Sequence, residues 1–130
     1  MNAIDLLLQK VTNSERESGT MTVFQSLSKD EQVALLEWSR SICVKLASYI
    51  EKRAVISHLG GSEKLDLPLP KMYVELALKI GVIRAQATNN PELLKGCETA
   101  FKEVLGGETR IKAFEEFKHL VALMLQLSKW

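Results

Sequence analysis

The sequence predicts an all-α protein, a helical bundle with four main helices and one or two short helices before them. Apolar residues recur at intervals of three and four through most of the chain, as they do along one face of a helix. No segment shows the alternating pattern, bounded by hairpin turns, that is typical of strands. A chain of 130 residues is long enough to bury one core, so we expect residues 1–130 to form a single domain.

Two short helices are predicted near the start of the chain, over about 3–11 and 21–27. Four apolar residues with helical spacing support the first of them: Ile4, Leu7, Leu8 and Val11. The segment TNSERESGT, residues 12–20, contains only polar residues and one glycine. We therefore predict that it is a polar link between the first short helix and the rest of the domain.

The longest predicted helix covers about 29–59 and starts at a capping box. In this arrangement the Ser28 hydroxyl accepts from the backbone of Glu31, and the Glu31 carboxylate accepts from the backbone of Ser28. No proline or glycine then interrupts the chain until Gly60. A helix of this size is about 45 Å long, so we expect it to be the spine of the domain.

Three further helices are predicted over about 70–88, 91–105 and 109–129. The second of these starts favourably, with Asn90 as the N-cap and Pro91 in the first turn. The helix over 70–88 is apolar almost all round its circumference, which predicts burial on most of its sides.

Small residues in two of these helices predict a close contact between them. Ala77, Gly81 and Ala85 lie four residues apart and form one ridge. Gly96 and Ala100 have the same spacing on the next helix. Because glycine in a helix interior costs about 1 kcal/mol relative to alanine, a packing role is the natural reason for it, and we expect the two ridges to meet.

Pro68 and Pro70, before the helix over 70–88, allow two interpretations. An extended, accessible proline segment could dock into the aromatic groove of a partner. Prolines also form rigid corners, since Pro70 suits the first helical turn and Pro68 keeps the preceding residue out of helical geometry. We favour the corner, with three alternating leucines laid along the bundle: Leu65, Leu67 and Leu69.

Charge and composition point away from nucleic-acid and membrane partners. Lys and Arg total 17 and Asp and Glu total 16, without a tail of either sign. The opening residues lack the features of a signal peptide, and the apolar run at 120–127 is far shorter than the ~20 residues of a membrane span. Two cysteines without zinc-site or disulfide spacing suit a reducing compartment, so we expect a cytoplasmic protein.

Residues with catalytic or metal-binding chemistry are few and form no recognised pattern. His58 and His119 fall on the polar faces of their helices, and the Glu116–His119 spacing used in di-iron bundles occurs only once. Cys43 and Cys97 lie on apolar stripes, the usual position of unreactive buried thiols. Phosphate loops and nucleophile motifs are absent. We therefore expect a non-enzymatic protein without catalytic residues, a metal site or a cofactor.

One flank of the longest helix combines aromatic and basic side chains, and it is the main candidate contact surface: Trp38, Lys45, Tyr49, Lys52 and Arg53. Such a flank could stack on bases and neutralise phosphates, or it could receive an acidic partner helix. It could also be the rim of the core, with lysine stems covering apolar surface, and the net charge near zero favours this interpretation.

Arg84 is the second candidate, because it falls on the apolar side of its helix together with Ala77. A guanidinium in that position needs a carboxylate, a bound anion or a partner, or a route by which its tip reaches solvent. The position near the negative end of the helix dipole favours the last alternative.

These observations predict a regulatory or adaptor module that binds protein partners, including a second copy of itself, through helix faces. Leu123 and Trp130, on the polar side of the last helix, are candidate subunit contacts. The alternative is a nucleic-acid-binding accessory protein that uses the same aromatic-basic flank, with help from Lys64 and Lys71.

Overall fold

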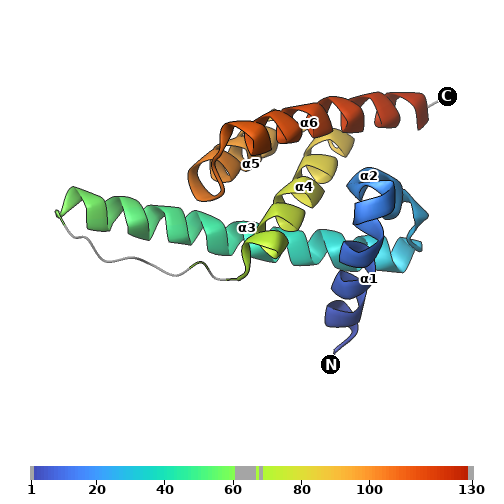
Figure 1. Ribbon diagram of the computed structural model, residues 1–130, viewed down its shortest axis with the longest axis horizontal. Coiled ribbons are helices and arrows are strands. Elements are labelled where there is room, and N and C mark those ends of the chain that lie inside the picture. Colours follow the sequence, from blue (N-terminus) through green and yellow to red (C-terminus); the bar gives the residue numbers. More distant parts are fainter. Residues whose placement is uncertain (1, 61–66, 68, 129–130) are drawn as a thin grey trace.

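The computed structural model describes residues 2–60, 67 and 69–128. These residues form six helices and no strand, and Figure 1 shows how the helices are arranged. The helices are α1 (Ala3–Ser18), α2 (Thr20–Ser26), α3 (Lys29–His58), α4 (Lys71–Ala87), α5 (Pro91–Val104) and α6 (Glu108–Ser128). The predicted all-α helical bundle is confirmed, and each main helix begins and ends within one residue of its predicted bounds.

Helix α4 lies at the centre of the bundle and contacts α2, α3, α5 and α6. In Figure 1 it crosses from α3 to α6 through the middle of the molecule. Its buried residues occupy almost its whole circumference: Val74, Leu76, Ala77, Leu78, Ile80, Gly81, Val82, Ile83 and Ala85. The expectation that the longest helix forms the spine is therefore wrong, because a helix that is apolar all round is stable only when other helices surround it.

Helices α5 and α6 pack on α4 and on each other. The rings of Phe101 and Phe114 are stacked with their centroids 4.1 Å apart. At the edge of this contact the half-buried Lys118 ammonium pairs with Glu98 on α5 and with Glu115 on its own helix, the latter at 2.8 Å. An aromatic pair under a charged bridge fixes the register of the two helices.

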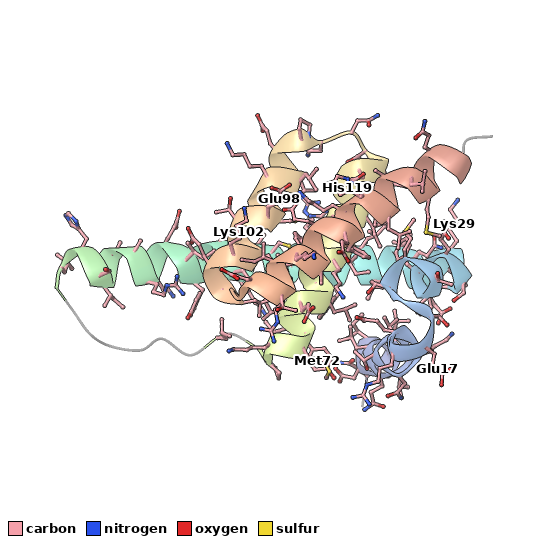
Figure 2. All side chains as sticks on the ribbon, turned by 45° about the horizontal axis from the view of Figure 1, so that its top comes forward. Glu17, Lys29, Met72, Glu98, Lys102 and His119 are labelled. Carbon is pink, nitrogen blue, oxygen red and sulfur yellow. The ribbon has the colours of Figure 1, made fainter. Side chains whose placement is uncertain are left out.

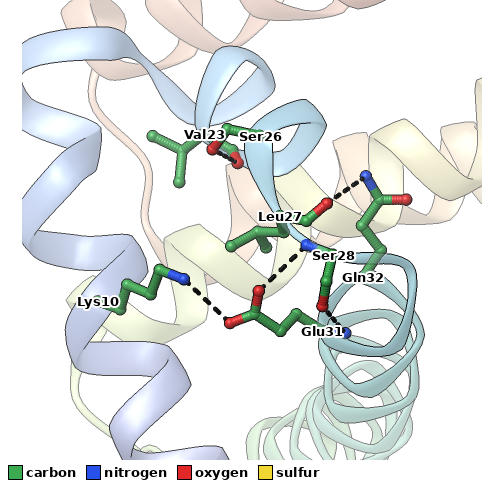
Figure 3. A network of polar contacts seen from close by, with 7 residues as sticks. All are labelled: Lys10, Val23, Ser26, Leu27, Ser28, Glu31 and Gln32. Carbon is green, nitrogen blue, oxygen red and sulfur yellow. Dashed lines mark hydrogen bonds and ion pairs between the residues drawn. The ribbon is translucent and has the colours of Figure 1, made fainter.

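The predicted capping box at the start of α3 is present and also anchors α1 (Figure 3). The Ser28 hydroxyl accepts from the Glu31 backbone N–H at 3.2 Å, and Glu31 Oε1 accepts from the Ser28 N–H at 3.1 Å. Glu31 Oε2 in turn accepts from Lys10 Nζ of α1 at 3.1 Å. The bond from the Ser28 backbone, followed by that from Lys10, lowers the pKa of Glu31, so this carboxylate is charged at neutral pH.

Helix α1 is longer than predicted, and the expected polar link over 12–20 is wrong. The helix continues to Ser18, and only Gly19, at a φ of 80°, separates it from α2. Most polar residues of this segment lie on the exposed side of a helix instead of in a tether, whereas Thr20 is buried in α2. Glu15 is half-buried, and its carboxylate accepts from Lys79 Nζ of α4 at 3.4 Å.

The two small-residue ridges do not meet as predicted. A Cβ atom on Gly81 would lie 2.8 Å from Cys97 Sγ, so a sulfur atom occupies the space that the glycine leaves open. A Cβ atom on Gly96 would have no neighbour within 4 Å. The close approach at α4 is therefore made by cysteine side chains, and Gly96 lies beside an open space.

The last turns of α3 extend beyond the rest of the bundle. No other helix lies beside this end of α3 in Figure 1 or in Figure 2, which adds the side chains. Between Glu51 and Gly60, only Ile56 is half-buried and every other residue is exposed. The predicted proline corner follows this segment. Its Leu67 and Leu69 are half-buried, and Pro70 is the N-cap residue directly before α4. Residues 61–66, Pro68 and Trp130 lie outside the described residues.

Candidate functional site

An apolar groove of about 550 Å³ runs between α3 and α5. Small side chains leave it open: Ala47 on α3 and Gly96 and Ala100 on α5 line it, together with larger apolar residues such as Ile50 and Leu93. Glu92 and Lys95 supply charge along its α5 side. We call this space the α3–α5 groove. Concave, mainly apolar spaces of this size are where proteins hold small ligands or partner side chains.

Both cysteines of the chain line this groove. Cys43 of α3 is half-buried and reaches the open space, whereas Cys97 of α5 is only 3% exposed. Both sulfur atoms lie close to the position that a Cβ atom on Gly81 would take, Cys97 Sγ at 2.8 Å and Cys43 Sγ at 3.7 Å. The helices therefore bring together two thiols that lie far apart in the sequence.

The neighbours of Cys43 change its acidity. The Cys97 thiol lowers the pKa of Cys43, burial opposes this, and the Arg84 charge and the Ser39 hydroxyl lower it further, to about 7. The pKa of Cys97 is raised, first by Cys43 and then by burial. The prediction that both thiols are unreactive does not fit these surroundings of Cys43, because a half-buried thiol with this pKa is about half ionised at neutral pH.

Arg84 lies beside this sulfur pair. It is half-buried, and its Nη1 donates to the Leu36 backbone carbonyl of α3 at 3.4 Å. Within the described part of the chain, no carboxylate lies within ion-pair distance of the Arg84 guanidinium. Of the alternatives for this residue, an internal ion pair is therefore not formed there, and its positive charge acts on the thiols instead.

The aromatic-basic flank of α3 is divided between the bundle and solvent. Trp38 is half-buried and packs edge-on against Tyr73 of α4, with the ring centroids 6.5 Å apart. Arg53 donates from both Nη atoms to the backbone carbonyl of Glu103 at 3.2 Å and lies 5.8 Å from the Tyr49 ring centroid. The remaining members, Lys45 and Lys52, are exposed. A partner-binding role for these residues stays a prediction.

A second surface on α3 was not recognised in the sequence. Val33, Val44 and Val55 are 47%, 66% and 57% exposed. They are eleven residues apart, which is close to three helical turns, so all three lie on one face. We call them the valine stripe. Arg40 and Glu51, both exposed, lie on the same side of the helix. The eleven-residue spacing is the sequence feature by which the valine stripe could have been found. The sequence alone does not reveal, however, which apolar face of α3 stays uncovered.

The other chemistry-bearing residues lie where the sequence placed them. His58, His119 and Glu116 are exposed, and Figure 2 shows His119 on α6. Among the residues that the structure describes, no three His, Cys, Asp or Glu side chains form a metal-binding group. None of the described helices has the length and apolar character to cross a membrane.

Comparisons with known proteins add no relative to these observations: no protein-family model, curated protein or solved structure matches the chain.

Proposed function

We propose that the protein is a non-enzymatic interaction module that self-associates, and that α3 is the contact helix of a homodimer. The valine stripe is the single observation that carries this proposal. Large apolar side chains in a row, each about half exposed or more, are typical of a surface that another molecule covers. The occupant that we propose is the same face of a second copy.

The spacing of the stripe makes it self-complementary. Val33 and Val55 lie at equal distances on either side of Val44. A two-fold axis at Val44 therefore pairs the helices antiparallel, with Val44 against its own copy and Val33 against Val55 of the second copy. A two-fold interface requires this kind of symmetry within one surface. The contact would extend over about 33 Å of helix.

Charges on the same face do not select this antiparallel register. The pairing places Arg40 opposite Ser48 of the second copy and one turn from its Glu51. Glu37 would face Glu51 directly, which is unfavourable, and Arg40, one turn from Glu37 along its own helix, lies near both carboxylates and offsets part of their repulsion. Exposed ion pairs contribute only about 0–1 kcal/mol each, so the register depends on the valines.

The size of the stripe indicates a weak, reversible dimer. Six half-covered valines contribute on the order of 5 kcal/mol from apolar burial, and association itself costs several kcal/mol. Contacts beside the stripe, including the exposed Leu59 at the end of α3, add to the free energy from apolar burial. A dissociation constant on the order of 100 μM corresponds to about 5.5 kcal/mol, so the proposal requires that contacts beside the stripe contribute at least as much as the valines do.

Sedimentation equilibrium between about 10 μM and 1 mM tests the dimer around that expected dissociation constant. The wild-type mass should rise with concentration from the monomer value of 14.6 kDa toward twice that value. Val44→Glu should keep the protein monomeric, because it places two carboxylates together at the two-fold axis. Leu123→Glu is the matched control, since Leu123 of α6 is also exposed, at 53%. A monomer at every concentration, or a dimer lost in Leu123→Glu and kept in Val44→Glu, would refute the proposal.

Nucleic-acid binding is the second candidate, supported only by the exposure of Lys45 and Lys52 on one flank of α3. Such binding would be driven by phosphate contacts and would weaken steeply with salt. Fluorescence anisotropy with a labelled single-stranded oligonucleotide at low salt tests it. A signal that the paired changes Lys45→Glu and Lys52→Glu abolish would support this candidate, and no signal would exclude it.

A further inference from the structure

The α3–α5 groove contains a pair of thiols with unequal surroundings. Cys43 lines the groove and is half-buried, so a small reagent that enters the groove reaches its sulfur atom. Cys97 also borders the groove but is almost completely covered. A reactive thiol that is accessible, with a second thiol beside it, is the arrangement of a redox-sensitive cysteine and its resolving partner.

We propose that Cys43 and Cys97 form a reversible, peroxide-sensitive dithiol, in which Cys43 is the attacking thiol and Cys97 resolves the oxidised product. This inference concerns a modification site and stands whether or not the valine stripe forms a dimer.

The contacts of each thiol assign these two roles. Cys43 has a hydroxyl, a thiol and a cation around it, supplied by Ser39, Cys97 and Arg84. The Cys97 thiol and the Arg84 cation stabilise a negative sulfur, which is the form that attacks an oxidant, whereas the Ser39 hydroxyl donates its proton to the Ala77 carbonyl. Cys97 keeps its proton, because burial and the neighbouring Cys43 both disfavour its ionisation. Cys97 therefore remains a neutral thiol until the Cys43 sulfur has been oxidised.

The chemistry requires one equivalent of hydrogen peroxide. The Cys43 thiolate attacks one peroxide oxygen, the O–O bond breaks, and hydroxide leaves, which gives a sulfenic acid at Cys43. The Cys97 sulfur then attacks the Cys43 sulfur, the S–O bond breaks, and water leaves after taking up the Cys97 proton. The two cysteines have together lost two electrons and two protons, and a disulfide joins α3 to α5. A dithiol reductant reverses the reaction.

The disulfide would form in the wall of the groove, beside α4. Gly81 leaves the space in which the two sulfur atoms lie, so no α4 side chain separates them. A covalent bond at this point fixes the spacing of α3 and α5 and removes the free thiol from the groove. Oxidation therefore changes both the shape and the chemistry of the apolar space.

Intact-mass measurement under non-reducing conditions tests the proposal directly, because the chain has only two cysteines. Treatment of the wild-type protein with one to a few equivalents of hydrogen peroxide should remove about 2 Da, and a dithiol reductant should restore the mass. Proteolytic mapping should show the Cys43 and Cys97 peptides joined. No loss of mass, or a disulfide that joins two chains instead, would overturn the proposal.

Two serine variants separate the roles of the thiols. In Cys97→Ser, peroxide should stop at the sulfenic acid of Cys43, which a dimedone probe traps. In Cys43→Ser, the buried Cys97 should react at least tenfold more slowly than Cys43 does in Cys97→Ser. Equal rates would show that Cys43 is not the attacking thiol. Circular dichroism establishes that each variant is folded, and the peptide mapping of the wild type does not depend on either variant.

Discussion

The acidity of Cys43 depends on Cys97 of α5 and Arg84 of α4. Ser39, one turn earlier on α3, has the smallest effect, because its hydroxyl donates to the Ala77 carbonyl. Of these, Arg84 is the only permanent charge, and it is fixed by its hydrogen bond to the Leu36 carbonyl. Its removal should therefore change the thiol without changing the groove.

Arg84→Gln should raise the pKa of Cys43, because it removes a cation that favours the thiolate. Alkylation by iodoacetamide, followed across pH, should show a midpoint near pH 7 for Cys43 in the wild type and a higher midpoint in the variant. At pH 7 the variant should thus react more slowly. Lys45→Gln is the control, since Lys45 is an exposed cation two residues from Cys43 on the same helix. An unchanged midpoint in Arg84→Gln would show that the guanidinium does not act on the thiol.

Ser39→Ala should lower the free energy of unfolding by about 1 kcal/mol. The Ser39 hydroxyl is completely buried and donates to the Ala77 carbonyl at 2.7 Å, which ties α3 to the central helix. Urea unfolding measures the loss, and Ser48→Ala, at an exposed position of α3, should be close to neutral. Equal stability of the two variants would mean that the buried hydrogen bond contributes nothing.

Single residues with functional potential could be recognised in the sequence, but the side chains that contact them in the fold could not. Arg84 was recognised as a cation on an apolar face that needs a partner, and both cysteines were placed on apolar stripes. Their proximity could not be predicted, because positions 43 and 97 lie on helices separated by the whole of α4. Only the packing of three helices brings those side chains together.

At the scale of helices, the two interior glycines should respond oppositely to alanine. Gly96→Ala should stabilise the protein by up to about 1 kcal/mol, because its Cβ enters open space and alanine favours the helix. Gly81→Ala should destabilise it by about 1–2 kcal/mol, since its Cβ would lie 2.8 Å from Cys97 Sγ. Urea unfolding of both variants measures the difference. A stabilising Gly81→Ala would show that Cys97 does not pack on this glycine.

Helix boundaries followed local chemistry closely where that chemistry is specific. The Ser28–Glu31 capping box starts α3, and the Asn90 side chain accepts from the Leu93 backbone N–H at the start of α5. The end of α1 could not be predicted in the same way, because residues 12–18 are polar but compatible with a helix. Whether such a segment becomes a link or a helix is decided by tertiary contacts such as the Glu15–Lys79 pair.

At the scale of the whole molecule, stability should fall from α4 outward to the end of α3. Hydrogen exchange measured by mass spectrometry should find the slowest amides in α4, which other helices surround, and fast exchange over 51–58. Raising the protein concentration should slow exchange along α3 in the wild type but not in Val44→Glu. Concentration-independent exchange in both proteins would contradict a dimer through α3.

Composition and periodicity were sufficient to predict the helical class, but not the central element. The apolar circumference of α4 was visible in the sequence, whereas the length of α3 suggested the wrong spine. Length determines where a helix can reach, and burial determines where it must lie. The valine stripe could not be predicted for a similar reason. Its spacing in the sequence is the same whether or not another helix covers it.

Because α3 is one continuous helix, it can act as a lever. Cys43 lies near its middle, while the end at His58 projects beyond the bundle. A tilt of about 5° at Cys43 would move His58 by roughly 2 Å, since about 22 Å of helix separate them. A small change in the spacing of α3 and α5 is thereby magnified at the tip of α3.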